Sequence, residues 1–185
     1  ARHKATMGAI SRGETMSGVA LEIIDLRKAF GGLPATNNVS LRVAPGERRL
    51  IIGPNGAGKT TLFNLITGDL LADAGSIRLF GEDVSKLAPH RRAHRGLART
   101  YQIITLFPKD TLEHNIVLAL LGLRPTRWEW FRPLAGHAEM VEEAHAVLAR
   151  VGLASLAKRT LAEVSYGEKR RVEIAMALAQ RPKVL

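Results

Sequence analysis

The first part of the chain carries patterns that predict β-strands. Residues 21–26 form a short apolar-rich run, and residues 38–43 alternate apolar and polar side chains, as half-buried strands do. Residues 75–80 alternate in the same way and end at the turn sequence 81–83. Residues 48–52, Arg-Arg-Leu-Ile-Ile, become apolar and β-branched toward their end, which is typical of a buried parallel strand.

Helical spacing replaces this pattern after about residue 102. Before that point, residues 60–66 already have helical spacing, and the basic residues 89–97 are also expected to be helical. Beyond it, residues 111–121 and 138–151 have the apolar period of α-helices. The expected inward face of the last segment consists of Val141, Ala144, Leu148 and Val151. The switch of period predicts two subdomains.

Composition narrows the class of protein. Of the 185 residues, 46% are hydrophobic, which suits one folded domain with an appendage. The sequence has no cysteine, which excludes disulfides and thiolate chemistry, and no apolar run near the length of about 18 residues that suggests a membrane-spanning helix. Residues 1–18 are polar and lack an apolar stretch long enough for a secretory signal, so we expect a disordered leader there.

The net charge of +10 raises nucleic acid or an anionic membrane surface as a partner. The basic residues gather in two groups along the chain. These groups are Arg91, Arg92, Arg95 and Arg99, and then Lys169, Arg170 and Arg171. We interpret them as solvated helix faces near a nucleotide, with a nucleic-acid surface as the alternative.

Residues 53–60 contain the most specific motif in the chain. They read Gly-Pro-Asn-Gly-Ala-Gly-Lys-Thr, which matches the phosphate-binding loop G-x-x-x-x-G-K-[ST] between a predicted strand and a predicted helix. The glycines let the backbone approach a phosphate, and their N–H groups form an anion-binding nest with the helix N-terminus. Lys59 supplies a positive charge for the β- and γ-phosphates, and Thr60 a hydroxyl for Mg²⁺. The motif predicts a nucleoside triphosphate site.

A second candidate segment, Val164–Arg171, precedes another run of helical character at 172–179. Serine and glycine at a helix start present backbone N–H groups that can bind an anion. A serine in that place is most often only an N-cap, so the segment gains its interest from the phosphate loop earlier in the chain.

Together, the phosphate loop, Gln102, a helical insert and Ser165–Glu168 resemble the ATP-binding subunit of an ABC transporter, across residues 21–185. Within that family, the chain resembles the ATPases of branched-chain amino acid importers. The segments that carry this closer resemblance are Phe30–Leu33, Arg99–Gln102, Leu106–Phe107, Ser165–Gly167 and Arg170–Ala175. The lipopolysaccharide-export ATPase is similar around residues 170–177 and is the nearest rival.

The resemblance implies a role for each matching residue. Phe30 would stack on adenine, and Gln102 would touch Mg²⁺ or the attacking water and report on the membrane subunit. Ser165 and Gly167 would bind the γ-phosphate of ATP held by a second ATPase subunit in a head-to-tail pair. Tyr166 departs from the glycine that is commoner at its position.

The resemblance also implies the full nucleotide site, with ATP and Mg²⁺ as cofactors. The residues that would hold the phosphates are Gly53, Pro54, Asn55, Gly56, Ala57, Gly58, Lys59, Thr60 and Thr61. Lys59 and Gln102 would be the catalytic residues, and Thr60 and Gln102 would contact the metal.

The fold implied by the resemblance is α/β, a P-loop NTPase core with an N-terminal antiparallel β region and an inserted helical subdomain. The expected divisions are a leader at 1–18, a nucleotide-binding core at 19–102, a helical subdomain at 103–164, and a signature helix with the start of the next core strand at 165–185. That strand carries an aspartate for Mg²⁺ and a glutamate that polarises the attacking water. The chain ends at Leu185, so we expect an incomplete sheet and no ATP hydrolysis by this chain alone.

The function implied by the resemblance is ATP binding and hydrolysis that powers a transporter, first of all an importer of branched-chain amino acids. The expected partners are transmembrane permease subunits, a second ATPase subunit and, indirectly, a periplasmic substrate-binding protein, at the cytoplasmic face of the inner membrane. The alternatives are a lipopolysaccharide-export ATPase, a nucleic-acid-associated ABC ATPase, and a fragment that binds ATP without hydrolysing it. The absence of cysteine and the short helical insert disfavour the nucleic-acid class.

Two apolar segments have neither strand nor helix pattern. The resemblance implies that Ile103–Phe107, next to Pro108, lines the groove for a short helix of the membrane subunit. Burial against the helix that begins near residue 111 is the alternative. Trp128, Trp130 and Phe131 lie in a second such segment, where we expect a local packing cluster, with a docking patch as the alternative.

Overall fold

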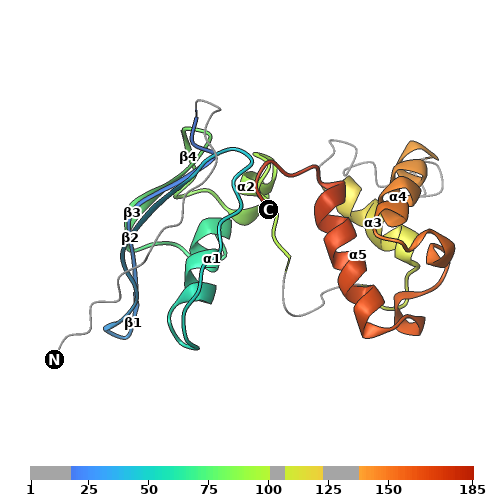
Figure 1. Ribbon diagram of the computed structural model, residues 1–185, viewed down its shortest axis with the longest axis horizontal. Helices are drawn as coiled ribbons and strands as arrows, with labels where there is room; N and C mark the ends of the chain where they lie inside the picture. The colour runs from blue at the N-terminus through green and yellow to red at the C-terminus, as the bar shows by residue number, and fades with distance from the viewer. Residues whose placement is uncertain (1–17, 101–106, 123–137) are drawn as a thin grey trace.

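The computed structural model describes residues 18–100, 107–122 and 138–185, which fold around two hydrophobic cores lying side by side (Figure 1). One core lies under an antiparallel sheet with the strand order β2-β1-β3-β4. The strands are β1 (Leu21–Phe30), β2 (Leu33–Val43), β3 (Ala74–Leu79) and β4 (Glu82–Asp83). The helices are α1 (Lys59–Thr67), α2 (Pro89–Ala93), α3 (Leu112–Leu121), α4 (Ala138–Arg150) and α5 (Tyr166–Ala179), with the 3-10 helices η3 (Ala154–Leu156) and η4 (Leu161–Glu163).

The strands predicted at 21–26, 38–43 and 75–80 are confirmed, and the first two are longer than expected. β1 continues to Phe30 and β2 begins at Leu33, and these two residues pair with each other across a two-residue turn. Gly31 and Gly32 in that turn have φ angles of 53° and 84°. Such left-handed backbone is the conformation that glycine adopts without steric cost, which is why a tight hairpin forms here.

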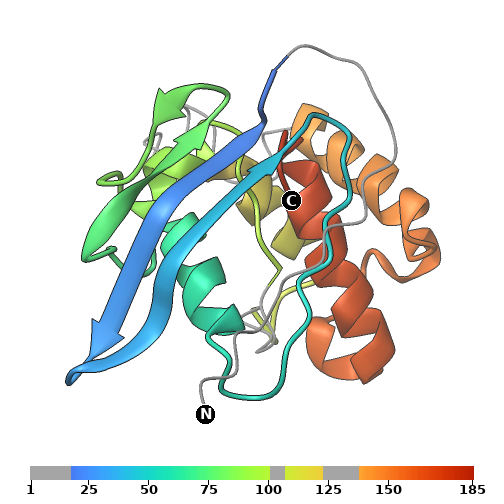
Figure 2. The ribbon, with the colours of Figure 1, turned by 60° about the vertical axis from the view of Figure 1, so that its left-hand side comes forward.

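α1 covers one face of the sheet and completes the first core (Figure 2). Its buried residues Leu62, Leu65 and Ile66 are spaced i, i+3 and i+4, so they form one stripe along the helix. The same cluster contains Ile23 and Ile77 from the middle of the sheet, both 1% exposed. The predicted helix at 60–66 is therefore confirmed, and the phosphate loop at its start is anchored to a buried element.

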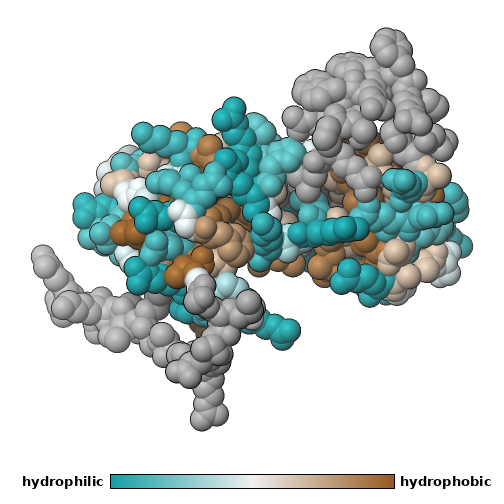
Figure 3. Space-filling model, turned by 90° about the horizontal axis from the view of Figure 1, so that it is seen from above, coloured by the Kyte–Doolittle hydropathy of each residue, from teal (hydrophilic) through white to brown (hydrophobic). Residues whose placement is uncertain are grey.

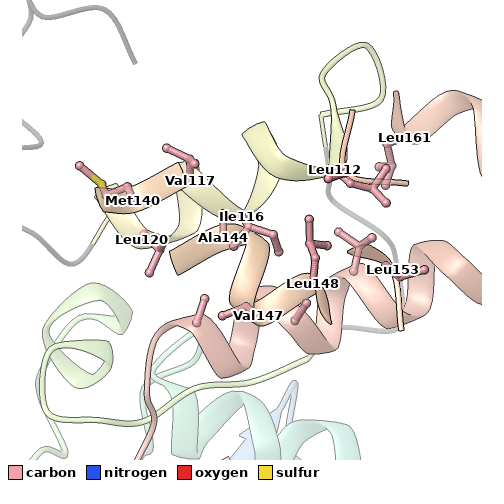
Figure 4. Close-up of a cluster of buried hydrophobic side chains, with 14 of the residues drawn as sticks. Leu112, Ile116, Val117, Leu120, Met140, Ala144, Val147, Leu148, Leu153 and Leu161 are labelled. Carbon is pink, nitrogen blue, oxygen red and sulfur yellow. The ribbon is translucent and has the colours of Figure 1, made fainter. Parts of the chain in front are cut away.

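The second core joins α3, α4 and α5 (Figure 4). On α4, Ala144 and Leu148 are fully buried, as predicted, but Val141 and Val151 are only partly buried. The inward face is shifted by one position, and its remaining members are Met140 and Val147. A period of 3.6 fixes the width of the apolar stripe, and the packing partners decide which edge of the stripe is covered. Both predicted helices, 111–121 and 138–151, are confirmed.

The predicted strand at 48–52 is wrong. Within the described ranges this segment pairs with no strand, and Leu50 and Ile52 are 78% and 82% exposed. An apolar, β-branched run becomes a buried strand only when neighbouring strands accept its hydrogen bonds and cover its side chains. The parallel pairing that the described residues do contain is a single bridge between Leu97 and Val184.

The helix predicted at 89–97 is shorter in the structure, and one of its arginines is not solvated. α2 ends at Ala93, and Leu97 has already left the helix to form the bridge with Val184. Arg92 is 1% exposed and donates to four backbone carbonyl oxygens, two of them on α1. The interpretation of this group as a solvated face was therefore wrong for Arg92, because its guanidinium group is held by carbonyls in the last turn of α1 and in the segment before α2.

Candidate nucleotide-binding site

The phosphate loop leads directly into α1, as the motif requires. Gly56 and Gly58 have φ angles of 80° and 79°, a conformation that other residues rarely adopt. Gly58 is the N-cap of α1 and lies against β2, where an added Cβ would be 2.1 Å from the carbonyl oxygen of Ala35. Two independent constraints thus require glycine at this position, and the contact places the loop next to the β1–β2 hairpin.

The N-terminus of α1 is open to an anion. Gly58 provides no side-chain cap, and the first turn contains no acidic residue. The first N–H groups of a helix have no intrahelical partner, and the helix dipole favours negative charge beside them. The middle of the loop, Pro54–Ala57, is exposed, and so is Thr60 in the first turn of the helix. Gly53 and Gly58 at the ends of the loop are half-buried, as is Thr61. The arrangement can bind a phosphate group through backbone N–H groups.

Lys59 lies back over the loop that precedes it. Its ammonium group donates to the carbonyl oxygens of Gly53 at 2.6 Å and Pro54 at 2.7 Å. An ammonium group has three donors, so these two bonds hold the charge over the loop and leave a third donor for a phosphate oxygen.

Phe30 ends β1 at the tip of the hairpin and is 48% exposed. Leu33, its partner across the turn, lies two residues before Ala35, which touches Gly58 of the phosphate loop. The hairpin that carries Phe30 is therefore the one that contacts the phosphate loop at the start of α1. An exposed ring near a phosphate site can stack on a base.

Ser165 is the N-cap of α5, as its sequence position suggested. Its side chain accepts from the N–H of Glu168 at 3.3 Å, and the Glu168 carboxylate accepts from the Ser165 N–H at 2.7 Å and hydroxyl at 2.8 Å. The bond from the Ser165 N–H, followed by that from its hydroxyl, holds the pKa of Glu168 below its ordinary value. Among the described residues, a Cβ added to Gly167 would meet no atom within 4 Å, so packing within this part of the chain does not explain that glycine.

The predicted site residues thus fall into three places. The phosphate loop and Phe30 belong to the part built on the sheet, and Ser165 and Gly167 belong to the part built on α3, α4 and α5 (Figure 1). Gln102 lies outside the described residues, as do Trp128, Trp130 and Phe131.

Of the apolar segment 103–107, only Phe107 is described. The side chain of Phe107 is 53% exposed. Its N–H and C=O groups are held by the amide of the buried Asn115, at 2.9 and 3.1 Å.

Sequence reasoning missed two residues that support the site. Asp73 and Lys28 form an ion pair at 2.7 Å beside Phe30, although they lie 45 positions apart in the chain. No motif marks either residue, and only the antiparallel pairing of β1 with β3 brings them together.

Comparison with known proteins places the chain in a family. The sequence model of the ABC transporter family matches residues 36–185. The chain belongs to the ABC transporter family. It is 39% identical over 179 residues to the high-affinity branched-chain amino acid transport ATP-binding protein BraF of Pseudomonas aeruginosa, and the alignment covers 92% of this chain and 69% of BraF. The corresponding protein LivG of Escherichia coli K12 is 36% identical with the same coverage.

Solved ABC cassettes have the same fold. A nucleotide-free ATP-binding cassette of an ABC transporter matches with a TM-score of 0.76 and 34% identity, over 89% of this chain and 66% of that cassette. A cassette in its ADP conformation matches with a TM-score of 0.78 and 34% identity, over 90% of this chain and 66% of that cassette. The predicted α/β P-loop NTPase fold with an open sheet is confirmed.

The ABC chain described here spans about two thirds of the length of these relatives. On the face seen in Figure 3, hydrophilic residues are distributed over both parts of the molecule. In the described part of the chain, no helix has both the length and the apolar character needed to cross a membrane.

Proposed function

We propose that this chain binds ATP as part of the ATP-hydrolysing, energy-coupling subunit of an ABC transporter that imports branched-chain amino acids, and that it does not hydrolyse ATP alone. The observation that carries the proposal is the phosphate loop, with the Lys59 ammonium group held against the loop carbonyls and the N-terminus of α1 left without a side-chain cap. The names of BraF and LivG, both branched-chain amino acid transport ATP-binding proteins, supply the substrate class.

The residues of the site divide the work of holding a nucleotide. The loop N–H groups and the first turn of α1 would bind the phosphates, and the third donor of the Lys59 ammonium group would bind a phosphate oxygen. Phe30 would stack on the base. Mg²⁺ supplies positive charge to the triphosphate when bound. The exposed hydroxyl of Thr60 suits the usual arrangement in which Mg²⁺ takes one or two protein oxygens and completes its shell with phosphate oxygens and water.

The remaining roles require a second subunit. Ser165 and Gly167 lie in a different part of the molecule from the phosphate loop, so we infer that they act on ATP held by a second ATPase subunit. Gln102 would contact Mg²⁺ or the attacking water. The functional units would be 19–102, 103–164 and 165–185. The partners would be permease subunits, and indirectly a periplasmic binding protein, with the chain at the cytoplasmic face of the membrane.

Two alternatives differ in partner rather than in the nucleotide site. A lipopolysaccharide-export ATPase and other cargoes stay open, because the sulfate/thiosulfate import ATP-binding protein CysA 1 of Chromobacterium violaceum is also 38% identical over 167 residues. The nucleic-acid class was favoured only by charge. Arg92 is buried, Arg95 pairs with Glu82, and Arg99 donates to Asn64, so this basic group is largely engaged within the chain.

The test is ATP binding by the full chain with and without the loop lysine. A charge-assisted contact to phosphate contributes roughly 1.5–3 kcal/mol, so Lys59→Ala should weaken ATP binding about tenfold or more in calorimetric titration. Lys86→Ala removes an exposed lysine from another surface and is the matched control, with unchanged affinity expected. Equal affinities of Lys59→Ala and the wild type would contradict the assignment.

The transported substrate is tested by comparing the uptake of labelled leucine with that of labelled sulfate in cells that contain the cognate permease.

A further inference from the structure

Asp73 lies in the connection between α1 and β3 and holds the end of β1. Its backbone N–H donates to the carbonyl oxygen of Arg27 at 2.9 Å. Its carboxylate accepts from the N–H of Ala29 at 2.8 Å and from the ammonium group of Lys28 at 2.7 Å. One residue therefore binds each of the three residues that precede Phe30 in the strand.

Lys28 carries this attachment to the aromatic ring. Its ammonium nitrogen lies 5.8 Å from the centroid of the Phe30 ring, within the range of a cation–π contact. The Lys28 side chain is 19% exposed, less than that of Asp73 at 48%. A lysine side chain ordinarily has high rotamer entropy, and the ion pair with Asp73 removes much of it. The cation is thus held above one face of the ring.

We propose that the Asp73–Lys28 pair positions Phe30 and polarises its ring as the stacking platform for the base of the bound nucleotide. The proposal rests on the nucleotide-binding function proposed above. A cation on one face of a phenyl ring draws π density toward itself, so an electron-rich purine stacks more favourably on the other face. A ring already fixed in place also loses less entropy when the base binds. Lys28 contacts the ring, and Asp73 contacts Lys28 and the strand, so we assign both as positioning residues.

A purely structural role for the pair makes a different prediction. If Asp73 only stabilised the end of the sheet, its loss would disturb the hairpin, which contacts the phosphate loop through Ala35 and Gly58. Binding of any ligand with phosphates would then weaken. If the pair acts on the ring, only ligands that carry a base are affected. ATP and inorganic tripolyphosphate separate these cases, because they share the phosphates and differ in the nucleoside.

The experiment measures the affinity of the full chain for MgATP and for magnesium tripolyphosphate by titration calorimetry. Asp73→Asn and Lys28→Met should each weaken ATP binding about three- to tenfold and leave tripolyphosphate binding within about twofold. Glu82→Gln is the matched control, since Glu82 pairs with Arg95 at 2.6 Å beyond the other end of β3 and should affect neither ligand. Tripolyphosphate binding also reports that each variant is folded.

A second comparison tests whether the effect passes through the ring. In a Phe30→Leu background, Asp73→Asn should cause no further loss of ATP affinity, because leucine offers no π face. The proposal is overturned if Asp73→Asn leaves ATP affinity unchanged, if both ligands weaken equally, or if the loss persists in the Phe30→Leu background. Failure of the wild-type chain to bind either ligand would instead overturn the nucleotide-binding function, and the proposal with it.

Discussion

Replacing Arg92 by methionine should destabilise the protein strongly, although the residue lies in a short surface helix. The guanidinium group donates to the carbonyl oxygens of Leu65 at 2.7 Å and Ile66 at 2.8 Å in the last turn of α1. It also donates to those of Leu87 and Ser85, both at 2.9 Å. Methionine fills a similar volume but leaves these four carbonyl groups without the donor.

The expected loss of stability is the energy of the four hydrogen bonds less the cost of burying the charged guanidinium group. Hydrogen bonds to a charged group contribute about 1.5–3 kcal/mol each, and four of them exceed the cost of burying the arginine. That cost is real here, because burial lowers the pKa of Arg92 from its ordinary value. A net loss of about 3–5 kcal/mol is expected, a large part of the 5–15 kcal/mol of a typical domain. For a chain of this size, such a loss lowers Tm by about 10 °C.

The assay is urea and thermal unfolding of the full chain, with Arg91→Met as the control. Arg91 is the exposed neighbour on the same helix, so its replacement removes equal charge and leaves the buried bonds intact. Arg92→Lys should give an intermediate loss, since one ammonium group reaches fewer of the four carbonyls. If Arg92→Met costs no more than about 1 kcal/mol beyond Arg91→Met, the reasoning about α1 is refuted.

Two further predictions concern single side chains. The hydroxyl of Thr36 is buried and has no hydrogen-bond partner in the described part of the chain, so Thr36→Val should leave the free energy of unfolding equal or raise it by about 1 kcal/mol in urea; a clear loss would show that the hydroxyl is satisfied. Burial raises the pKa of Glu113, but bonds to Lys158 and His145 outweigh it and hold that pKa below the ordinary 4.5. The ionised carboxylate therefore stabilises the fold fully above pH 4.5, and this contribution is lost as the pH falls through the lowered value. Glu113→Gln should cost about 1 kcal/mol at neutral pH, and the difference from the wild type should shrink in acid; a difference that stays constant with pH would contradict the assignment.

The elements that the sequence predicted well are those with local causes. Most of β1 and β2 follows from the apolar run at 21–26 and the alternation at 38–43, and α1 follows from a helical stripe after the phosphate loop. The prediction of a strand at 48–52 was wrong. Its apolar character shows only that these side chains could be buried, and no local sequence pattern shows whether a neighbouring strand pairs with them.

Arg92 shows that local sequence also fails to predict whether a charged residue is buried. A basic run looks the same in sequence whether its residues are solvated or buried, and the carbonyl that Arg92 binds on Leu65 lies 27 positions away. The candidate site also contains residues that a local motif marks and residues that only the fold brings together. The phosphate loop is a continuous motif, so its residues were predictable, whereas the Lys28–Asp73 pair spans 45 positions and depends on strand register.

Arg92 and Asp73 hold different elements of the proposed site, so comparing their variants distinguishes the roles of these elements in nucleotide binding. Arg92 fixes the last turn of α1, whose first turn carries the phosphate loop, while Asp73 fixes the end of β1, which carries Phe30. The pieces meet where Gly58 lies against Ala35. Loosening α1 should therefore lower stability and weaken binding of ATP and tripolyphosphate alike, whereas removing the Asp73 carboxylate, which acts on the Phe30 ring, should weaken ATP binding alone. The contrast between the two variants separates support of the phosphates from support of the base within one protein.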